Sequence, residues 1–200
     1  MKRRAIGLLS TMAVVLVVGS GVALAATTIH CPNDTSKGSP STALYCNGTA
    51  AADTMYGSDL YDFMLGKGGQ DTMHGYAGSD YLGGNNGSDH LYGDAGNDQL
   101  WGGGIDKSAT PTDTDASDDY VHGGVGDDYI WGGYAQSGVD RLYGEGGKDY
   151  IDASQRKAPD PAAFQLTKEI IDCGAGASDE VYFDKGLDVV ATNCEIKHPF

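Results

Sequence analysis

Aspartate recurs every nine residues in the middle of the chain, and the residues around it keep the same period. Glycine occupies every ninth position from Gly48 to Gly102, and a large apolar residue stands two positions after each aspartate. The aspartates of the first six repeats are Asp53, Asp62, Asp71, Asp80, Asp89 and Asp98. Carboxylate oxygens are ligands for hard divalent cations where the fold brings them together. A fixed short period of this kind is typical of a repeat architecture.

The repeat unit reads G-x-x-G-x-D-x-U-x, where U is the large apolar residue, and it predicts one turn followed by one short strand. Glycine tolerates the positive φ angles of tight turns. The last three residues alternate polar and apolar, which suits a strand with one buried side chain. Two units would form a flattened coil of 18 residues with a strand on each side. Units two apart would then stack about 4.8 Å from each other.

This stacking predicts two ladders of carboxylates. Asp53, Asp71 and Asp89 would line one edge of the coils, and the aspartates of the alternate units would line the other. Such ladders repel, and tight turns leave backbone carbonyls pointing inward. Calcium resolves both problems, because it takes six to eight oxygen ligands, whereas magnesium demands a smaller octahedron and keeps its waters. The alternative is a metal-free solenoid whose glycines only turn the corners. An aspartate in every turn favours the cation.

Three consecutive units, GYAGSDYLG, GNNGSDHLY and GDAGNDQLW at residues 75–83, 84–92 and 93–101, resemble the RTX (hemolysin-type) calcium-binding nonapeptide. The resemblance implies an all-β fold, a parallel β-roll (a right-handed β-solenoid), with several Ca²⁺ ions held in the turns by aspartates and glycine-loop carbonyls. We leave the first two units out of the ligand set, because Ala51 and Leu60 replace their second glycine. The side-chain ligands implied are Asp71, Asp80, Asp89, Asp98, Asp128 and Asp149. The glycines of the same turns are Gly66, Gly69, Gly75, Gly78, Gly84, Gly87, Gly93, Gly96, Gly123, Gly126, Gly144 and Gly147.

Residues 1–25 have the pattern of a cleaved signal peptide. Three cations precede an apolar run that ends in Ala23-Leu24-Ala25, an A-x-A cleavage signature. An uncleaved membrane anchor is the alternative, but the small residues that close the run favour cleavage. We therefore expect a secreted, extracellular protein with no stable membrane insertion after signal cleavage. Loss of three of the 13 basic residues, against 28 acidic ones, leaves a net charge near −18. This charge argues against a nucleic-acid partner.

Four cysteines allow three disulfide connectivities in an oxidising compartment. We favour the two short-range pairs, Cys31 with Cys46 and Cys173 with Cys194, because each pair brackets one end of the repeats. A solenoid needs its terminal coils covered. A zinc site is the other interpretation of Cys and His residues, but the close C-x-x-C spacing is missing.

The repeat pattern divides the mature chain into three parts. We expect an irregular N-terminal cap over 26–47, the β-roll over 48–152 with a loop at 105–118, and a C-terminal part over 153–200 with a loop, degenerate repeats and a cap. If Gly48 opens unit one, extra residues fall in units seven, nine and eleven. All three insertions would then protrude from the same edge of the roll. A different count of units within 102–122 would shift this parity.

We expect a calcium-binding protein that is not an enzyme and whose folding is coupled to the metal, because no catalytic motif is present. An alternative function is binding of cell-surface polysaccharide by outward aromatic side chains. Sugar faces stack on such rings. Aromatic residues also pair across strands on any sheet surface, so cross-strand packing is the competing interpretation. The outward residues on the even units are Phe63, Leu65, Tyr81, Trp101, Tyr129, Trp131 and Tyr150. His74, His90 and His122 lie outward on the odd units, where a histidine metal site competes with simple solvation.

Overall fold

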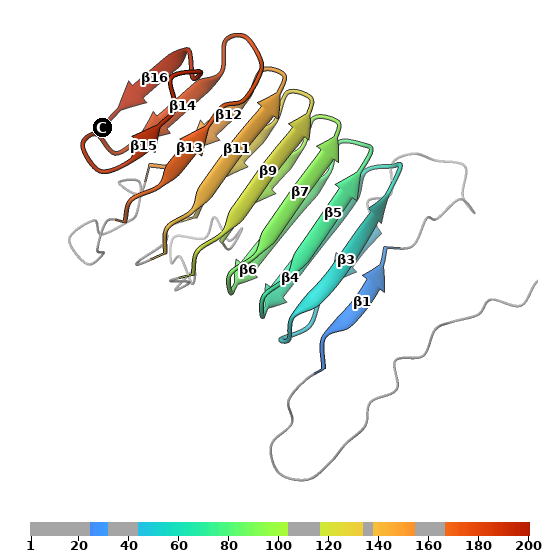
Figure 1. Cartoon of the computed structure of the whole chain (residues 1–200). Helices are drawn as coiled ribbons and strands as arrows, with labels where there is room; N and C mark the ends of the chain where they lie inside the picture. Colours follow the sequence, from blue (N-terminus) through green and yellow to red (C-terminus); the bar gives the residue numbers. More distant parts are fainter. Residues whose placement is uncertain (1–24, 32–43, 104–116, 134–137, 155–166) are drawn as a thin grey trace, which may run out of the picture.

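The chain folds into two parallel β-sheets that face each other across a thin core (Figure 1). The computed structural model describes residues 25–31, 44–103, 117–133, 138–154 and 167–200. One sheet, here the odd sheet, contains β1 (Thr27–His30), β3 (Asp53–Ser58), β5 (Thr72–Tyr76), β7 (His90–Ala95), β9 (Tyr120–Val125), β11 (Arg141–Gly146), β13 (Ile170–Asp172) and β15 (Val189–Val190). The even sheet contains β2 (Leu44–Asn47), β4 (Asp62–Gly68), β6 (Tyr81–Asn86), β8 (Gln99–Trp101), β10 (Tyr129–Trp131), β12 (Tyr150–Asp152), β14 (Glu180–Phe183) and β16 (Ile196–Pro199). This arrangement confirms the predicted parallel β-roll.

Successive strands alternate between the sheets, so each pair of units makes one coil. In the regular part, equivalent residues of neighbouring coils are 18 positions apart: Met55 pairs with Met73, and Met64 pairs with Leu82. Where the chain carries extra residues the strands keep the same register, as when Leu91 pairs with Val121. The inserted residues therefore leave the ladder itself intact.

The core consists of one inward side chain per strand. The residue two positions after each ladder carboxylate is at most 1% exposed along the central coils, as the period predicts. These residues are Met55, Met73, Leu91, Val121, Leu142 and Ile171 on the odd sheet, and Met64, Leu82, Leu100, Ile130, Ile151 and Val181 on the even sheet. Full burial of such a side chain stabilises the fold by about 1.5–3 kcal/mol. One inward apolar side chain per strand leaves a narrow interior.

The two sheets extend beyond 48–152 at both ends. β1 and β2 pair with β3 and β4, and β13 to β16 continue both sheets at the C-terminal end. Disulfides join Cys31 to Cys46 and Cys173 to Cys194, which confirms the short-range pairing. All four cysteines belong to the apolar core, so each disulfide covers one end of it.

The three connections with extra residues link β8 to β9, β10 to β11, and β12 to β13. Each connection runs from a strand of the even sheet to a strand of the odd sheet, and most of the inserted residues, with their predicted protrusion from one edge, lie outside the described residues. The signal peptide predicted over 1–25 and the loop predicted at 105–118 lie almost wholly outside the described residues. Within the described part of the chain no helix is long and apolar enough to cross a membrane.

Candidate metal centre

Each ladder carboxylate sits at the start of a strand and is fixed by the coil before it. The backbone N–H of Asp62 donates to Oδ1 of Asp80 at 2.8 Å, and the N–H of Asp80 donates to Oδ1 of Asp98 at 2.7 Å. The same bond joins Asp98 to Asp128, and Asp128 to Asp149. The odd edge carries an equivalent ladder through Asp53, Asp71, Asp89, Asp119 and Asp140. Stacking thus uses one oxygen of every carboxylate and leaves the other to be satisfied elsewhere.

The second oxygen is buried without a hydrogen-bond donor in most of the central turns. The atoms concerned are Oδ2 of Asp71, Asp80, Asp98, Asp128, Asp149 and Asp179. Asp89 is also fully buried, and its Oδ1 accepts the N–H of Asp71. A buried carboxylate oxygen without a partner is costly. Five of the six predicted ligands therefore present an oxygen that a cation would stabilise.

Backbone carbonyls lie beside these oxygens, next to the first glycine of each turn. A Cβ atom placed on Gly75 would lie 2.6 Å from Oδ2 of Asp80 and 2.8 Å from the carbonyl oxygen of Gly93. At Gly123 the same position lies 2.5 Å from Oδ2 of Asp128 and 2.8 Å from the carbonyl oxygen of Gly144. The first glycine of the turn therefore leaves space in which two acceptor oxygens from adjacent coils converge. Gly66, Gly84, Gly93 and Gly144 repeat this arrangement.

The second glycine of each G-x-x-G unit shapes the backbone of the turn. Gly69, Gly78, Gly87, Gly96, Gly126 and Gly147 have φ angles from 112° to 150°. At Gly87 and Gly96 a Cβ would overlap the carbonyl group of the glycine one coil earlier. These positions therefore require glycine both for the backbone angle and for close stacking.

Burial raises the pKa of the central carboxyl groups. The pKa of Asp71 and Asp98 rises to about 6, that of Asp128 and Asp149 to about 7, and that of Asp80 to about 8, from an ordinary value of 3.8. The N–H bond from the preceding coil lowers each pKa only in part, and neighbouring carboxylates raise it further. A nearby cation would favour the ionised form.

The oxygen set fits a hard cation. Among the described residues no three His, Cys, Asp or Glu side chains gather at one point. A shell in these turns would take one carboxylate from a turn and complete itself with backbone carbonyls, the all-oxygen environment that calcium accepts. The candidate histidine His74 contacts other side chains instead. Its ring stacks between Tyr56 and Tyr92, and its Nδ1 lies 3.3 Å from Oδ2 of Asp94.

The two edges of the roll differ in regularity. The turns that lead into the even strands of the central region carry no insertion, and they hold four of the predicted ligands, Asp80, Asp98, Asp128 and Asp149. The turns that lead into β9, β11 and β13 carry the extra residues. Only Asp71 and Asp89 occupy regular glycine turns on that odd edge. The even edge therefore offers the longer continuous series of equivalent oxygen sites.

One ladder residue, Glu169, escaped the sequence prediction. Glu169 occupies the aspartate position on the odd edge, where its Oε2 accepts the N–H of Asp140 at 2.5 Å and its own N–H donates to Asp188. Burial raises the pKa of Glu169 to about 7. Asp179 continues the even edge and accepts the N–H of Asp149 at 2.9 Å. Ile171, two positions after Glu169, is the signal that could have found it, whereas Asp179 and Val181 keep the nine-residue period in the sequence.

The family comparison agrees with the geometry. A model of the RTX calcium-binding nonapeptide repeat matches residues 47–82, 56–90, 83–104, 113–133 and 134–155. Comparison with curated protein sequences and with solved structures gave no match. The matched segments cover just over half of the 200 residues and include all the turns that hold the predicted ligands. The chain belongs to the RTX calcium-binding nonapeptide repeat family.

Proposed function

We propose that this protein is exported and binds several Ca²⁺ ions between its stacked turns, and that binding drives the central coils to fold. The observation that carries the proposal is the row of buried Oδ2 atoms without a donor, most of which lie beside a backbone carbonyl from the adjacent coil. Asp80, Asp98, Asp128 and Asp149 would hold ions on the even edge, and Asp71 and Asp89 on the odd edge.

Calcium, when bound, supplies positive charge and a flexible oxygen shell that ties one coil to the next. The chain contributes preset geometry, because the N–H of each aspartate fixes the next carboxylate. Without the ion, the buried carboxylates repel one another, and the glycine-rich turns lose much backbone entropy on ordering. Metal-binding free energy would therefore be folding free energy.

The test is a calcium titration of the purified protein by isothermal titration calorimetry, followed in parallel by far-UV circular dichroism. We expect several ions to bind and the β-sheet signal to grow with occupancy. A protein that binds no calcium, or whose spectrum is the same in calcium and in EDTA, would contradict the proposal.

Export rests on the N-terminal sequence and on the two disulfides, which form and persist in oxidising compartments. We infer cleavage after Ala25. N-terminal sequencing of the protein recovered from the culture medium should begin at Ala26. Recovery of an uncleaved chain in the membrane fraction would instead favour the anchor.

Carbohydrate binding is a second candidate function, and one feature favours it. A depression of about 640 Å³ on the even sheet is lined by Trp101, Tyr129 and Tyr150 together with the polar residues Asn97, Asp98, Gln99, Asp127, Asp128 and Lys148. It lies where Gln99 stands between Tyr81 and Tyr129 in the outward column. Aromatic surface beside polar groups suits a sugar ring.

The rest of the aromatic column favours cross-strand packing. The rings of Phe63 and Tyr81 stack at 4.8 Å, and those of Tyr129 and Tyr150 at 4.9 Å, so these rings cover each other's faces. Trp101 and Trp131 are 5% and 6% exposed, and the prediction of an exposed ladder is wrong for both. A glycan array probed in calcium separates the candidates. Binding that Gln99→Tyr abolishes would support a sugar site, and an array without signal would leave calcium binding alone.

A further inference from the structure

Among the described turns without inserted residues, from the turn of Asp53 to that of Asp149, there are two kinds, which differ in the residue four positions before the aspartate. In the central turns this residue has a left-handed backbone, with φ of 79° at Lys67, 73° at Asn85 and 71° at Asp94. In the first two turns Thr49 and Ser58 lack a positive φ. Their N–H groups instead donate to Oδ2 of Asp53 and Asp62, each at 2.6 Å. We call the first kind open turns and the second kind self-capped turns.

The residue two positions before the aspartate explains the difference. Open turns have glycine there with φ above 110°, as at Gly69 and Gly78. Ala51 and Leu60 occupy the same position in the self-capped turns, and side-chain-bearing residues rarely adopt that angle. The backbone therefore follows another path, which brings the N–H of Thr49 or Ser58 onto the carboxylate. The Ser58 hydroxyl adds a second donor to Oδ2 of Asp62 at 2.9 Å.

Internal hydrogen bonds thus replace the cation in the first coil of repeats. Burial alone would raise the pKa of Asp53, but hydrogen bonds from Thr27 and Thr49 outweigh it and lower that pKa. The pKa of Asp71, one coil later on the same edge, is raised by burial to about 6. Protein donors therefore favour the anionic form of the terminal carboxylate, whereas Oδ2 of the central one has no donor among the described residues.

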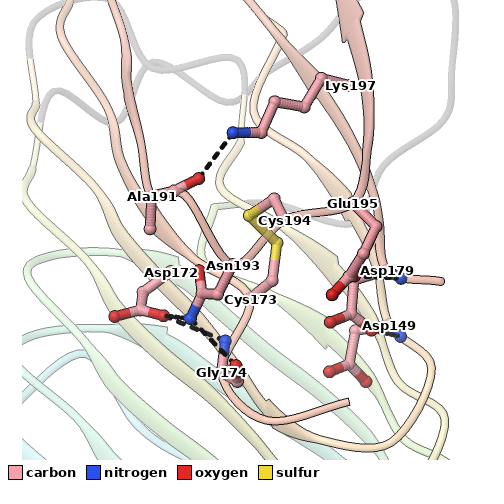
Figure 2. Close-up of a disulfide and its surroundings, with 10 residues drawn as sticks. All are labelled: Asp149, Asp172, Cys173, Gly174, Asp179, Ala191, Asn193, Cys194, Glu195 and Lys197. Carbon is pink, nitrogen blue, oxygen red and sulfur yellow. Dashed lines mark hydrogen bonds between the residues drawn. A yellow bond between two sulfur atoms is a disulfide. The ribbon is translucent and has the colours of Figure 1, made fainter. Parts of the chain in front are cut away.

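The C-terminal end also supplies its own donors (Figure 2). The N–H of Asp184 donates to Oδ2 of Asp188 at 2.6 Å, again from four positions earlier. Nδ2 of Asn193 donates to Oδ1 of Asp172 at 2.6 Å and to the carbonyl oxygen of Gly174 at 2.9 Å. Nζ of Lys197 donates to the carbonyl oxygen of Ala191 at 2.7 Å. Asn193 lies beside the Cys173–Cys194 disulfide, so covalent and hydrogen-bonded closure coincide at this end.

We propose that both ends of the roll stay folded without calcium and act as fixed templates on which the calcium-dependent central coils form. The proposal rests on calcium binding by the open turns, as proposed above. The N-terminal end joins two self-capped turns to a disulfide, the C-terminal end joins one to a disulfide, and both ends present strand edges that the next coil can pair with. In stacked repeats, order propagates between neighbours from a preformed unit. Calcium would then control only the middle of the molecule.

Hydrogen exchange with mass spectrometry tests the template model on the purified protein in calcium and in EDTA. In EDTA the amides of β3 and β4 should exchange at least about tenfold more slowly than those of β7 to β10, and this contrast should vanish in calcium. Equal and rapid exchange of ends and centre in EDTA would overturn the proposal. If the parent protein binds no calcium by calorimetry, the proposed function fails. If it binds calcium but exchanges uniformly, only the template model fails.

A designed turn tests the structural rule directly. Ser58→Gly with Leu60→Gly removes the hydroxyl donor and supplies glycine where the open turns have it. We expect this variant to bind one more calcium ion than the parent and to lose the protection of β4 in EDTA. Leu60→Ala is the matched control and should leave both the number of ions and the protection unchanged. A double variant with the parent's ion count and protection would overturn the assignment of self-capped turns.

Discussion

At the scale of single residues, one residue type has two roles that its neighbours decide. Asp62 and Asp80 belong to the same ladder, and both are buried. Oδ2 of Asp62 accepts hydrogen bonds from Ser58, whereas Oδ2 of Asp80 has no donor among the described residues. The aspartate alone does not define a metal ligand. We infer that the backbone of the preceding turn decides whether the carboxylate is open to a metal ion.

Asp128 and Asp127 form a matched pair for testing this assignment. Asp128 is buried with an open Oδ2, while the adjacent Asp127 is exposed and accepts the N–H of Lys148 through Oδ1. Asp128→Asn should weaken calcium binding by about tenfold or more, because loss of even an outer-shell partner costs that much. Asp127→Asn makes the same change of charge and should leave the calorimetric affinity nearly unchanged. Equal effects of the two variants would mean that net charge, not coordination, governs binding.

The raised pKa values predict opposite pH trends with and without metal. In the metal-free fold the pKa values of about 6 to 8 at Asp71, Asp80, Asp98, Asp128 and Asp149 lie above the ordinary 3.8, so the folded state holds protons that the unfolded state releases. Their contribution to stability is fully present below pH 4 and is lost as the pH rises through about 8. Far-UV circular dichroism in EDTA should therefore show more β-sheet at pH 5 than at pH 8. In millimolar calcium the order should reverse, because protons compete with the metal. A β-sheet signal in EDTA that rises with pH would contradict the raised pKa values.

At the scale of the element, each open turn has two residues with positive φ. The sequence regularly places glycine at only one of these two positions. The second glycine of each unit takes the larger positive φ angle. The position after the first glycine is held by Lys67, Tyr76, Asn85, Asp94 and Glu145, all with φ between 71° and 79°. Left-handed φ costs a side-chain-bearing residue roughly 1–2 kcal/mol. The turns therefore hold strain that the stacking of coils offsets.

Lys67 is a suitable place to relieve this strain, because within the described part of the chain no aromatic contact or ion pair involves it. Lys67→Gly should stabilise the calcium-loaded protein by about 1 kcal/mol, since glycine adopts φ near 79° without the steric cost. Denaturant unfolding in saturating calcium would measure the change. Lys67→Ala controls for loss of the side chain and should give no gain. A destabilised glycine variant would show that the lysine side chain contributes more than its backbone strain costs.

The sequence predicted the strands and the core better than it predicted the ends and the insertions. The nine-residue period places the inward residues, because the backbone of a strand alternates its side chains. Glu169 escaped detection because the residues before it break the period and because glutamate replaces aspartate there. Thr49 and Ser58 escaped as donors because hydrogen-bonded capping depends on the backbone path, which a pattern of residue types does not show.

At the scale of the whole molecule, repulsion between exposed charges and coordination of buried oxygens respond to different ions. The chain carries a formal net charge of −15, and much of it lies on turns at the edges of the roll. Dissolved salt screens exposed charges across a Debye length of about 3 Å at 1 M. It does not supply a ligand for oxygens that are buried between coils, such as Oδ2 of Asp98. General repulsion and specific coordination can therefore be separated by the choice of ion.

Protein is first held in EDTA and then freed of the chelator. We expect calcium to restore its β-sheet signal. Neither 1 M sodium chloride nor millimolar magnesium should do so. Sodium chloride relieves only the exposed repulsion. Magnesium brings the same charge as calcium, but it demands a near-ideal octahedron and gives up its waters reluctantly, which carbonyls spaced by stacked coils do not match. Far-UV circular dichroism of one dialysed sample divided among the three ions makes the comparison. Recovery in magnesium equal to that in calcium would show that divalent charge suffices, and recovery in sodium chloride would show that the turns need no ligand at all.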